Sequence, residues 1–137
     1  MLEVGLVNQS DIHALWPDVK KFVDWSCAES FGDITPTEVK LKILSGEWVL
    51  IVAFDGKTKR IEGVVIAHVF NRINDRVAFV TVISGKFMTN EYSFGRLKEL
   101  LIALGATCIE GNVRDSVLKL LGRLGFVKKT TTISYPL

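Results

Sequence analysis

The chain has 137 residues, of which 48% are hydrophobic, and a formal net charge of +2. This length predicts a single domain, residues 1–137, whose core needs no disulfide or metal for stability. Lysines and arginines are scattered among acidic residues, so nothing in the charge pattern indicates a nucleic-acid partner. The N-terminal residues lack a signal-peptide pattern, and no apolar run is long enough to cross a bilayer. We therefore expect a cytoplasmic protein with no membrane partner.

The N-terminal residues predict a strand followed by a helix. Leu2–Val7 alternates between apolar and other residues, as a short strand does. Asn8 or Ser10, in the sequence NQSD, can then accept backbone N–H bonds and begin a helix. The helix should run to about Cys27, with a break or kink at Pro17, because proline cannot donate the helical hydrogen bond.

A second helix has a clearer beginning, at the sequence TPTE. Thr35 is placed as the N-cap, Pro36 as the first helical residue, and Glu38 where a capping box has its acid. Gly46 should end this helix.

The pattern changes to strands from residue 48 onward. The segments 48–54, 61–70 and 76–83 are rich in β-branched and aromatic residues at both odd and even positions. The sequences DGKTKR and NRINDR separate them and carry turn residues. We expect an antiparallel meander of three largely buried strands.

Leucines at helical spacing predict a helix over residues 91–104, ending at Gly105. The short segment 107–112 then reads as a strand. Because a helix joins it to the strand at 77–83, we expect these two strands to be parallel.

The remaining residues predict a helix over 114–124, stopped by Gly125, and a final strand over 126–135. The element order is thus β-α-α-β-β-β-α-β-α-β. It predicts an α/β fold with a mixed, mostly antiparallel twisted sheet.

Few polar residues are placed for chemistry. Cys27 and Cys108 lie far apart without a C-x-x-C or Cys/His cluster, so we expect reduced thiols and no metal site. His68 shares strand parity with Val64 and Ile66, which predicts a core histidine with satisfied hydrogen bonds rather than a catalytic base.

The element order, together with GATCIEGNV and LLGRLGF within residues 105–126, resembles the GCN5-related N-acetyltransferase (GNAT) superfamily. Members commonly carry Gly-Ala before their fifth strand and Leu-Gly-Phe after their fourth helix. The resemblance implies that the fourth and fifth strands splay apart in the centre of the sheet and admit the pantetheine arm of acetyl-CoA. It implies transfer of the acetyl group to an amine by direct attack.

The resemblance also implies a cofactor site on the fourth strand, the segment after it and the last helix. Its residues here are Val80, Thr81, Val82, Gly85, Lys86, Phe87, Met88, Thr89, Asn90, Asn112 and Leu121. The backbone amides of 85–90, GKFMTN, would hold the diphosphate of coenzyme A; a shorter following helix would instead begin at Gly95 and Arg96 and place the site there. Met88 and Asn90 stand where the family has glycines.

Two further positions bear on catalysis. Leu121 stands where many members carry a tyrosine that can protonate the departing thiolate, and leucine cannot donate a proton. Glu110 lies on the fifth strand, beside the implied acetyl position, and its carboxylate could take a proton from a substrate amine through water. The alternative is that Glu110 is a surface charge at the edge of the sheet.

Two functions therefore remain open. The first is an acetyl-CoA-dependent N-acetyltransferase with a small-molecule or peptide amine as acceptor. The second is a catalytically degenerate GNAT-like binding or structural protein, similar to short bacteriophage proteins of this fold, of which some are associated with the virion; such a protein would reside in the host cytoplasm or the virion. The resemblance places the acceptor site at residues 25–34 and 130–135, and it leaves a homodimer open.

Overall fold

The structure is a computed structural model that describes residues 1–29 and 34–137. Its described residues form one five-stranded sheet in the order β1-β2-β3-β4-β5. The strands are β1 (Leu2–Leu6), β2 (Val49–Asp55), β3 (Ile61–Asn71), β4 (Arg76–Gly85) and β5 (Cys108–Glu110). The first four strands pair antiparallel and β5 pairs parallel to β4, so the expected mixed α/β sheet and its central meander are confirmed.

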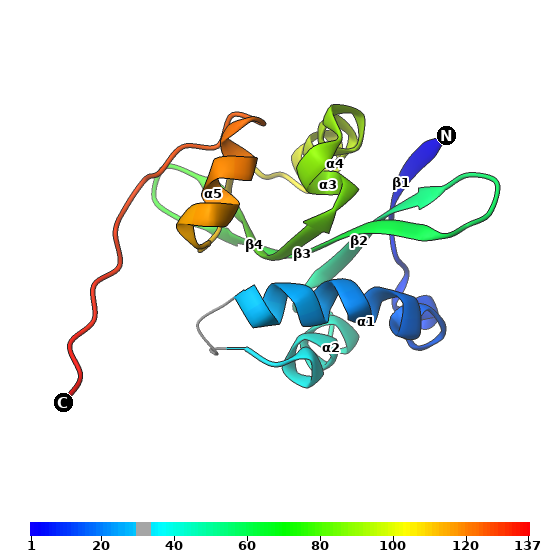
Figure 1. The fold of residues 1–137 in the computed structure, drawn as a ribbon, viewed down its shortest axis with the longest axis horizontal. Helices are drawn as coiled ribbons and strands as arrows, with labels where there is room; N and C mark the ends of the chain where they lie inside the picture. Colours follow the sequence, from blue (N-terminus) through cyan, green and yellow to red (C-terminus); the bar gives the residue numbers. More distant parts are fainter. Residues whose placement is uncertain (30–33) are drawn as a thin grey trace.

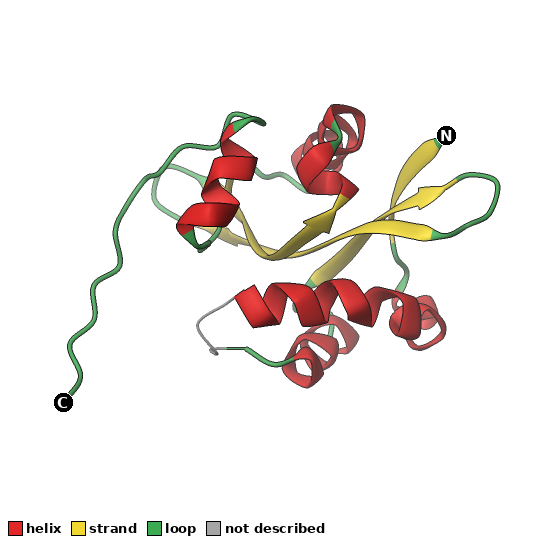
Figure 2. Ribbon diagram, viewed as in Figure 1, coloured by secondary structure: helices red, strands yellow, loops and turns green. Residues whose placement is uncertain are grey.

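Helices cover both faces of this sheet (Figures 1 and 2). One face carries α1 (Ile12–Glu29), preceded by the short turn η1 (Gln9–Asp11), and α2 (Pro36–Leu44). The other face carries α3 (Lys86–Thr89), α4 (Glu91–Ala103) and α5 (Asp115–Gly122). The chain therefore forms three layers, with the sheet in the middle.

Two apolar cores lie between these layers. Val64 and Ile66 of β3 pack toward α1 and α2, whereas Val65 and Ala67 pack toward α4 and α5. All four residues are fully buried. A strand covered on both faces has apolar residues at odd and even positions, which is why the sequence of the meander shows no alternation.

The helix α1 runs without interruption through Pro17, so of the expected break or kink, the break is wrong. Proline in a helix interior costs about 3 kcal/mol. Burying one large apolar side chain stabilises a fold by about 1.5–3 kcal/mol. The inner face of α1 buries Ile12, Trp16, Val19 and Val23. Their combined burial outweighs the loss of one hydrogen bond.

The predicted start of α2 is confirmed in detail. The Thr35 side chain accepts a hydrogen bond from the Glu38 backbone N–H at 3.3 Å, and its hydroxyl donates to the Glu38 carboxylate at 3.3 Å. Pro36 occupies the first helical position. The cap thus satisfies one backbone donor that the first turn leaves without a helical partner, and the bond between the two side chains holds it in place.

The helix α4 and the strand β5 also follow the prediction. Val77 of β4 lies in parallel register with Cys108, and Phe79 lies in register with Glu110. Thr107 fixes the beginning of β5, because its hydroxyl accepts from the Arg76 backbone N–H at 3.0 Å and its own N–H donates to the Arg76 carbonyl at 2.8 Å.

The final strand expected over 126–135 is not formed. Residues 126–137 have no regular secondary structure, and all but Phe126 are exposed. The reason is the lack of a partner: β5 offers only three residues of edge, and an extended segment has no stable hydrogen-bonded state without a neighbouring strand.

The strand β4 ends at a glycine that the fold requires. Gly85 has a φ of +67°, and a Cβ there would lie 2.3 Å from the carbonyl oxygen of Glu62 in β3. By contrast, a Cβ on Gly95, within α4, would meet no atom within 4 Å.

These two glycines give a matched pair of variants. We expect Gly85→Ala to lower the free energy of unfolding by about 2–4 kcal/mol, since it combines a left-handed residue with a backbone clash. Gly95→Ala should raise it by about 0.5–1 kcal/mol, because alanine favours the helix. Urea denaturation of the three proteins measures both changes, and equal stability of the Gly85→Ala variant and the wild type would contradict the packing at the end of β4.

Candidate functional site

The strands β4 and β5 separate soon after they pair. Their register stops at Phe79 and Glu110, whereas β4 continues to Gly85. At the point of separation a Cβ on Gly111 would lie 2.9 Å from the carbonyl oxygen of Val80, so only glycine allows this close approach. Beyond it, the outer edge of β4 has no pairing with β5.

A β-bulge lies at the same point of β4. Ile66 of β3 is in register with Val82, and the next residue, Ala67, is in register with Val80. Thr81 is therefore the extra residue and has no register partner. The backbone of Val80, Thr81 and Val82 is thus irregular on the β3 side and unpaired on the β5 side. Its free N–H and C=O groups can pair with an extended ligand.

The segment predicted to hold a diphosphate is a helical turn, α3, rather than an open loop. Phe87 is fully buried and Met88 is 6% exposed, and both belong to the core under α4 and α5. Lys86 and Thr89 are exposed. The turn is therefore anchored by two side chains, unlike a glycine-rich loop whose bare backbone curls around a phosphate.

The start of α4 is capped by the chain itself. Asn90 accepts a hydrogen bond from the Ser93 backbone N–H through its Oδ1 at 3.0 Å. The Ser93 hydroxyl lies 2.9 Å from the Lys86 carbonyl and 3.0 Å from that of Asn90. Glu91 adds a negative charge in the first turn. This charge opposes the approach of a phosphate to that helix end.

Acetyl-CoA therefore fits one half of this site better than the other. The open edge of β4 suits the amide groups of a pantetheine arm. At the α4 terminus, Asn90 occupies the Ser93 N–H and Glu91 adds a negative charge, and both disfavour a diphosphate there.

The last helix contributes apolar packing here. Leu121 is 4% exposed and belongs to the same core cluster as Val80, Phe87 and Met88, so four of the predicted cofactor residues lie in one apolar cluster. Asn112 is exposed between β5 and α5.

The candidate catalytic residue Glu110 is held by two cations. Arg72 donates to both carboxylate oxygens, at 2.6 and 2.7 Å, and the Lys129 ammonium lies 2.7 Å from Oε2. These bonds from Lys129 and Arg72 hold the pKa of the Glu110 carboxyl below its ordinary value of 4.5. Glu110 is thus ionised at neutral pH. Sequence reasoning missed both partners, because the contacts span 38 and 19 residues and leave no local pattern.

His68 lies in an aromatic row on the α1–α2 face of the sheet. Its ring centroid is 5.8 Å from that of Trp48, 5.4 Å from Phe70 and 5.6 Å from Phe79. Its Nδ1 is buried and has no hydrogen-bond partner among the described residues, so the expected satisfied core histidine is wrong. The aromatic neighbours that occupy the surrounding space have no polar atom to offer, except at the indole nitrogen.

This environment changes the pKa of His68. Burial lowers the pKa of the imidazole below its ordinary value of 6.5, because desolvation disfavours the charged form; the Glu47 carboxylate acts in the opposite direction. Phe79 is in register with both His68 and Glu110, so the imidazole and the carboxylate lie two strands apart at one level of the sheet.

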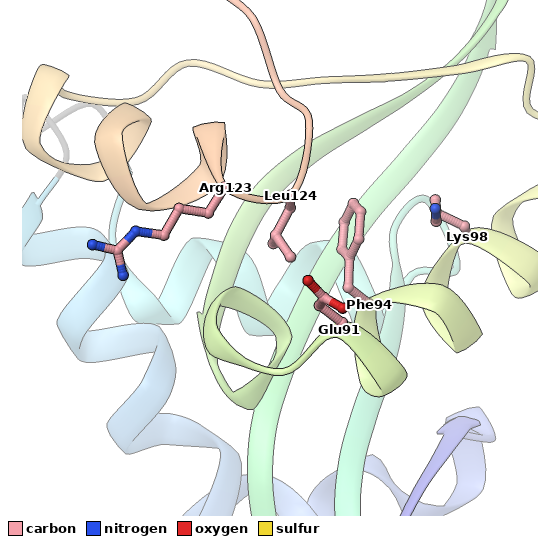
Figure 3. Close-up of a pocket in the computed structure, with 5 residues that line it drawn as sticks. All are labelled: Glu91, Phe94, Lys98, Arg123 and Leu124. Atoms are coloured by element: carbon pink, nitrogen blue, oxygen red, sulfur yellow. The ribbon is translucent and has the colours of Figure 1, made fainter.

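A cavity of about 270 Å³ lies between α4 and α5. It is lined by Glu91, Phe94, Lys98, Arg123 and Leu124. In Figure 3, Phe94 and Leu124 approach each other while Arg123 points away from the other four. None of these residues was selected from the sequence, although the spacing of Phe94 and Lys98 is that of neighbours on one helix face.

The two predicted acceptor segments, 25–34 and 130–135, do not form a defined site among the described residues. Residues 30–33, within the expected segment 25–34, lie outside the described residues. Residues 130–135 are exposed and extended away from the body of the protein. Within the described parts of the chain, no three His, Cys, Asp or Glu side chains gather as metal ligands, and no helix has the length and hydropathy to cross a membrane.

Burial of His68 within the aromatic row predicts a lowered pKa for its imidazole. We expect an NMR titration of its imidazole, assigned with the His68→Gln variant, to give a midpoint below 6.5, the ordinary value. The unfolded chain then binds more protons than the folded one between the two pKa values, so this residue's contribution to stability is lost as pH falls from 6.5 through the folded pKa. Trp48→Leu, which opens the row, should raise the midpoint; a midpoint above 6.5 in the wild type would contradict the burial of Nδ1.

The comparisons with known proteins agree with this geometry. No family model and no curated protein sequence match the chain. Among solved structures, a probable acetyltransferase superposes with a TM-score of 0.69 at 13% identity, covering 98% of this chain and 96% of that one. A predicted acetyltransferase from Clostridium acetobutylicum, solved with acetyl-CoA, gives 0.65 at 14% identity, with 99% and 96% covered. An aminoglycoside acetyltransferase from an uncultured soil sample, in complex with sisomicin, gives 0.69 at 9% identity, with 99% and 96% covered. The chain therefore has a GNAT-like fold.

Proposed function

We propose that the protein is an acetyl-CoA-dependent N-acetyltransferase that transfers the acetyl group to an amine by direct attack. The observation that supports this most strongly is the separation of β4 from β5 next to the bulge at Thr81, in a fold similar to that of acetyltransferases. No other stretch of described backbone in the sheet interior is left open in this way.

In this proposal the backbone of Val80–Val82 pairs with the pantetheine arm and polarises the thioester carbonyl. An amine held beside the strand then attacks the carbonyl carbon, and coenzyme A leaves. Such a reaction depends mainly on proximity and on a fixed hydrogen-bond donor, so it needs no covalent enzyme intermediate.

Glu110 is the proposed proton acceptor, through a bound water. Because Arg72 and Lys129 keep it ionised, its carboxylate is available at neutral pH but is a weak base. Leu121 cannot protonate the thiolate, so water takes that role.

Gly85 through Asn90 are the proposed contacts of the diphosphate, with exposed Lys86 as their one cation. Since Glu91 follows directly, we expect weaker binding than a glycine-rich loop would give. We propose an amine as the acceptor because an aminoglycoside acetyltransferase of similar fold was solved in complex with sisomicin.

A second candidate function is that of a GNAT-like binding or structural protein without catalytic activity. A bacteriophage virion is one assembly in which such a protein would occur. Three observations favour this second function: the anchored turn α3, the acid at the α4 terminus and the buried Leu121. Each removes a feature that acetyl transfer uses, while leaving the fold intact.

Ligand-dependent stability tests the cofactor. We expect acetyl-CoA to raise the melting temperature, because a ligand at 100 times its dissociation constant adds about 2.7 kcal/mol to the free energy of unfolding. Thermal unfolding with acetyl-CoA, and with inorganic diphosphate as a control for general anion effects, measures this. No shift at millimolar acetyl-CoA would contradict the cofactor proposal.

Leu121→Tyr separates the two functions. In an enzyme the new phenol should preserve or raise turnover of acetyl-CoA with a panel of amines, since a positioned acid is typically worth 10²–10⁴-fold. In a binding protein it should only overpack the core and lower stability by about 1–3 kcal/mol.

Leu120→Tyr is the matched control, because Leu120 is 36% exposed on the same helix and its replacement adds the same group outside the core. Turnover readily detected in the wild type would rule out the binding protein. Neither turnover nor acetyl-CoA binding in any of the three proteins would rule out the enzyme.

A further inference from the structure

An aromatic row crosses the sheet on the face that carries α1 and α2. Phe79 lies on β4, His68 and Phe70 lie on β3, and Trp48 directly precedes β2. The centroid of the His68 ring is 5.6 Å from that of Phe79, 5.4 Å from that of Phe70 and 5.8 Å from that of Trp48. His68 thus joins the other three rings into one continuous aromatic surface.

The helices leave part of this row uncovered. On β3, Val64 and Ile66 are fully buried in the core with α1 and α2. The next two residues on that face, His68 and Phe70, are only partly buried. In the view of Figure 1, the turn that joins β3 to β4 projects beyond both helices. The helical cover therefore ends after Ile66, and the rings keep part of their surface accessible to a ligand.

One end of the row lies at the opening of the sheet. Phe79 is in register with Glu110, and β4 and β5 separate at the next residue, Val80. A ligand seated on the row would thus place one end beside the Glu110 carboxylate. The same end would lie next to the backbone that is proposed to polarise the thioester carbonyl.

A carboxylate lies near each end of the row, and both already have cationic partners. Glu110 is held by Arg72 and Lys129, at 2.6 and 2.7 Å. Glu47, whose charge acts on the imidazole of the row, pairs with Lys42 at 2.8 Å. These pairs contain three cations and two carboxylates. A ligand with several positive charges therefore meets no unpaired acid in them and is repelled by the excess cation.

The rings themselves suit a flat, apolar ligand. Burial lowers the pKa of His68 below 6.5, so its imidazole is uncharged at neutral pH and acts as a fourth aromatic ring. Aromatic rings gain free energy from one another beyond the burial of their area. Their faces also attract a single ammonium group.

We propose that the acceptor is a primary amine on an aromatic body, an arylalkylamine rather than a polycationic aminoglycoside. The inference rests on the proposed acetyl transfer. The aromatic body packs on Phe79, His68 and Trp48, and the amine lies at the Phe79 end. Its nitrogen bonds to the acetyl carbon, and the carbon–sulfur bond breaks. The proton that the nitrogen releases passes through water to Glu110, and water returns one to the leaving thiolate.

Acetyl transfer to three amines tests the selectivity. These are phenethylamine, cyclohexylethylamine, which has the same linker and a saturated ring, and sisomicin. We expect the highest kcat/KM for phenethylamine, because only its ring can make aromatic contacts with the row. Equal values for the two ring amines, or a preference for sisomicin, would overturn the inference and leave the acetyltransferase function in place.

Variants of the row remove the effect of amine basicity, which is the same for every protein. Trp48→Leu should lower the ratio of kcat/KM for phenethylamine to that for cyclohexylethylamine by about 2–10-fold, mainly through KM. Phe54→Leu is the matched control, since Phe54 is also partly buried on this face but lies at the far end of β2. It should leave the ratio unchanged. An equal ratio in the Trp48→Leu variant and the wild type speaks against the row.

Binding without acetyl-CoA separates this inference from the proposed function. Added phenethylamine should shift the NMR signals of the His68 ring protons, and the shift should saturate at a lower concentration in the wild type than in Trp48→Leu. If no amine is acetylated but these shifts are found, the proposed function fails and the aromatic-amine site stands. If phenethylamine leaves the His68 signals unchanged, the site is overturned, even where acetylation occurs.

Discussion

The short parallel contact between β4 and β5 is the constraint on which the candidate site depends. Three register pairs, from Val77–Cys108 to Phe79–Glu110, hold the strands together, and Gly111 lets them pass the Val80 carbonyl before they separate. The position of β4 is fixed independently by β3 along nearly its whole length. The opening beyond Val80 therefore lies beside a strand whose position is fixed on its other side by β3.

The two faces of the sheet give this opening two different environments. Toward α4 and α5 it is apolar, with Met88 and Leu121 in one cluster. Ile109 packs on that side, so the alternation of a strand places its neighbour Glu110 on the other face, at the level of His68 and Phe79. His68 and Glu110 thus lie on the face opposite Met88 and Leu121.

The sequence allowed most of the fold to be predicted, because most of it depends on local or pairwise patterns. Apolar residues at both parities indicated strands covered on two faces, and Thr35 with Glu38 indicated the start of α2. The predictions were wrong where contacts between residues far apart in the sequence determine the structure. The apolar face of α1 overrides Pro17, and the segment 126–135 has strand propensity but no partner. Likewise, no pattern shows that the neighbours of His68 Nδ1 are rings, or that Glu110 faces Arg72 from a residue 38 positions away.

The turn after β4 is stabilised by packing within the protein and does not need a bound cofactor to form. Burial of Phe87 and Met88 contributes about 1.5–3 kcal/mol for each side chain, which is a large share of the 5–15 kcal/mol that stabilises a typical domain. A glycine-rich loop in the same place would contribute none of this and would depend on a bound diphosphate for order. Here the turn is closed by the core beneath it, by Gly85 against Glu62 and by the cap that Asn90 places on α4. The turn is therefore held by the fold itself, and in the proposed function the charges of Lys86 and Glu91 would set the strength of diphosphate binding.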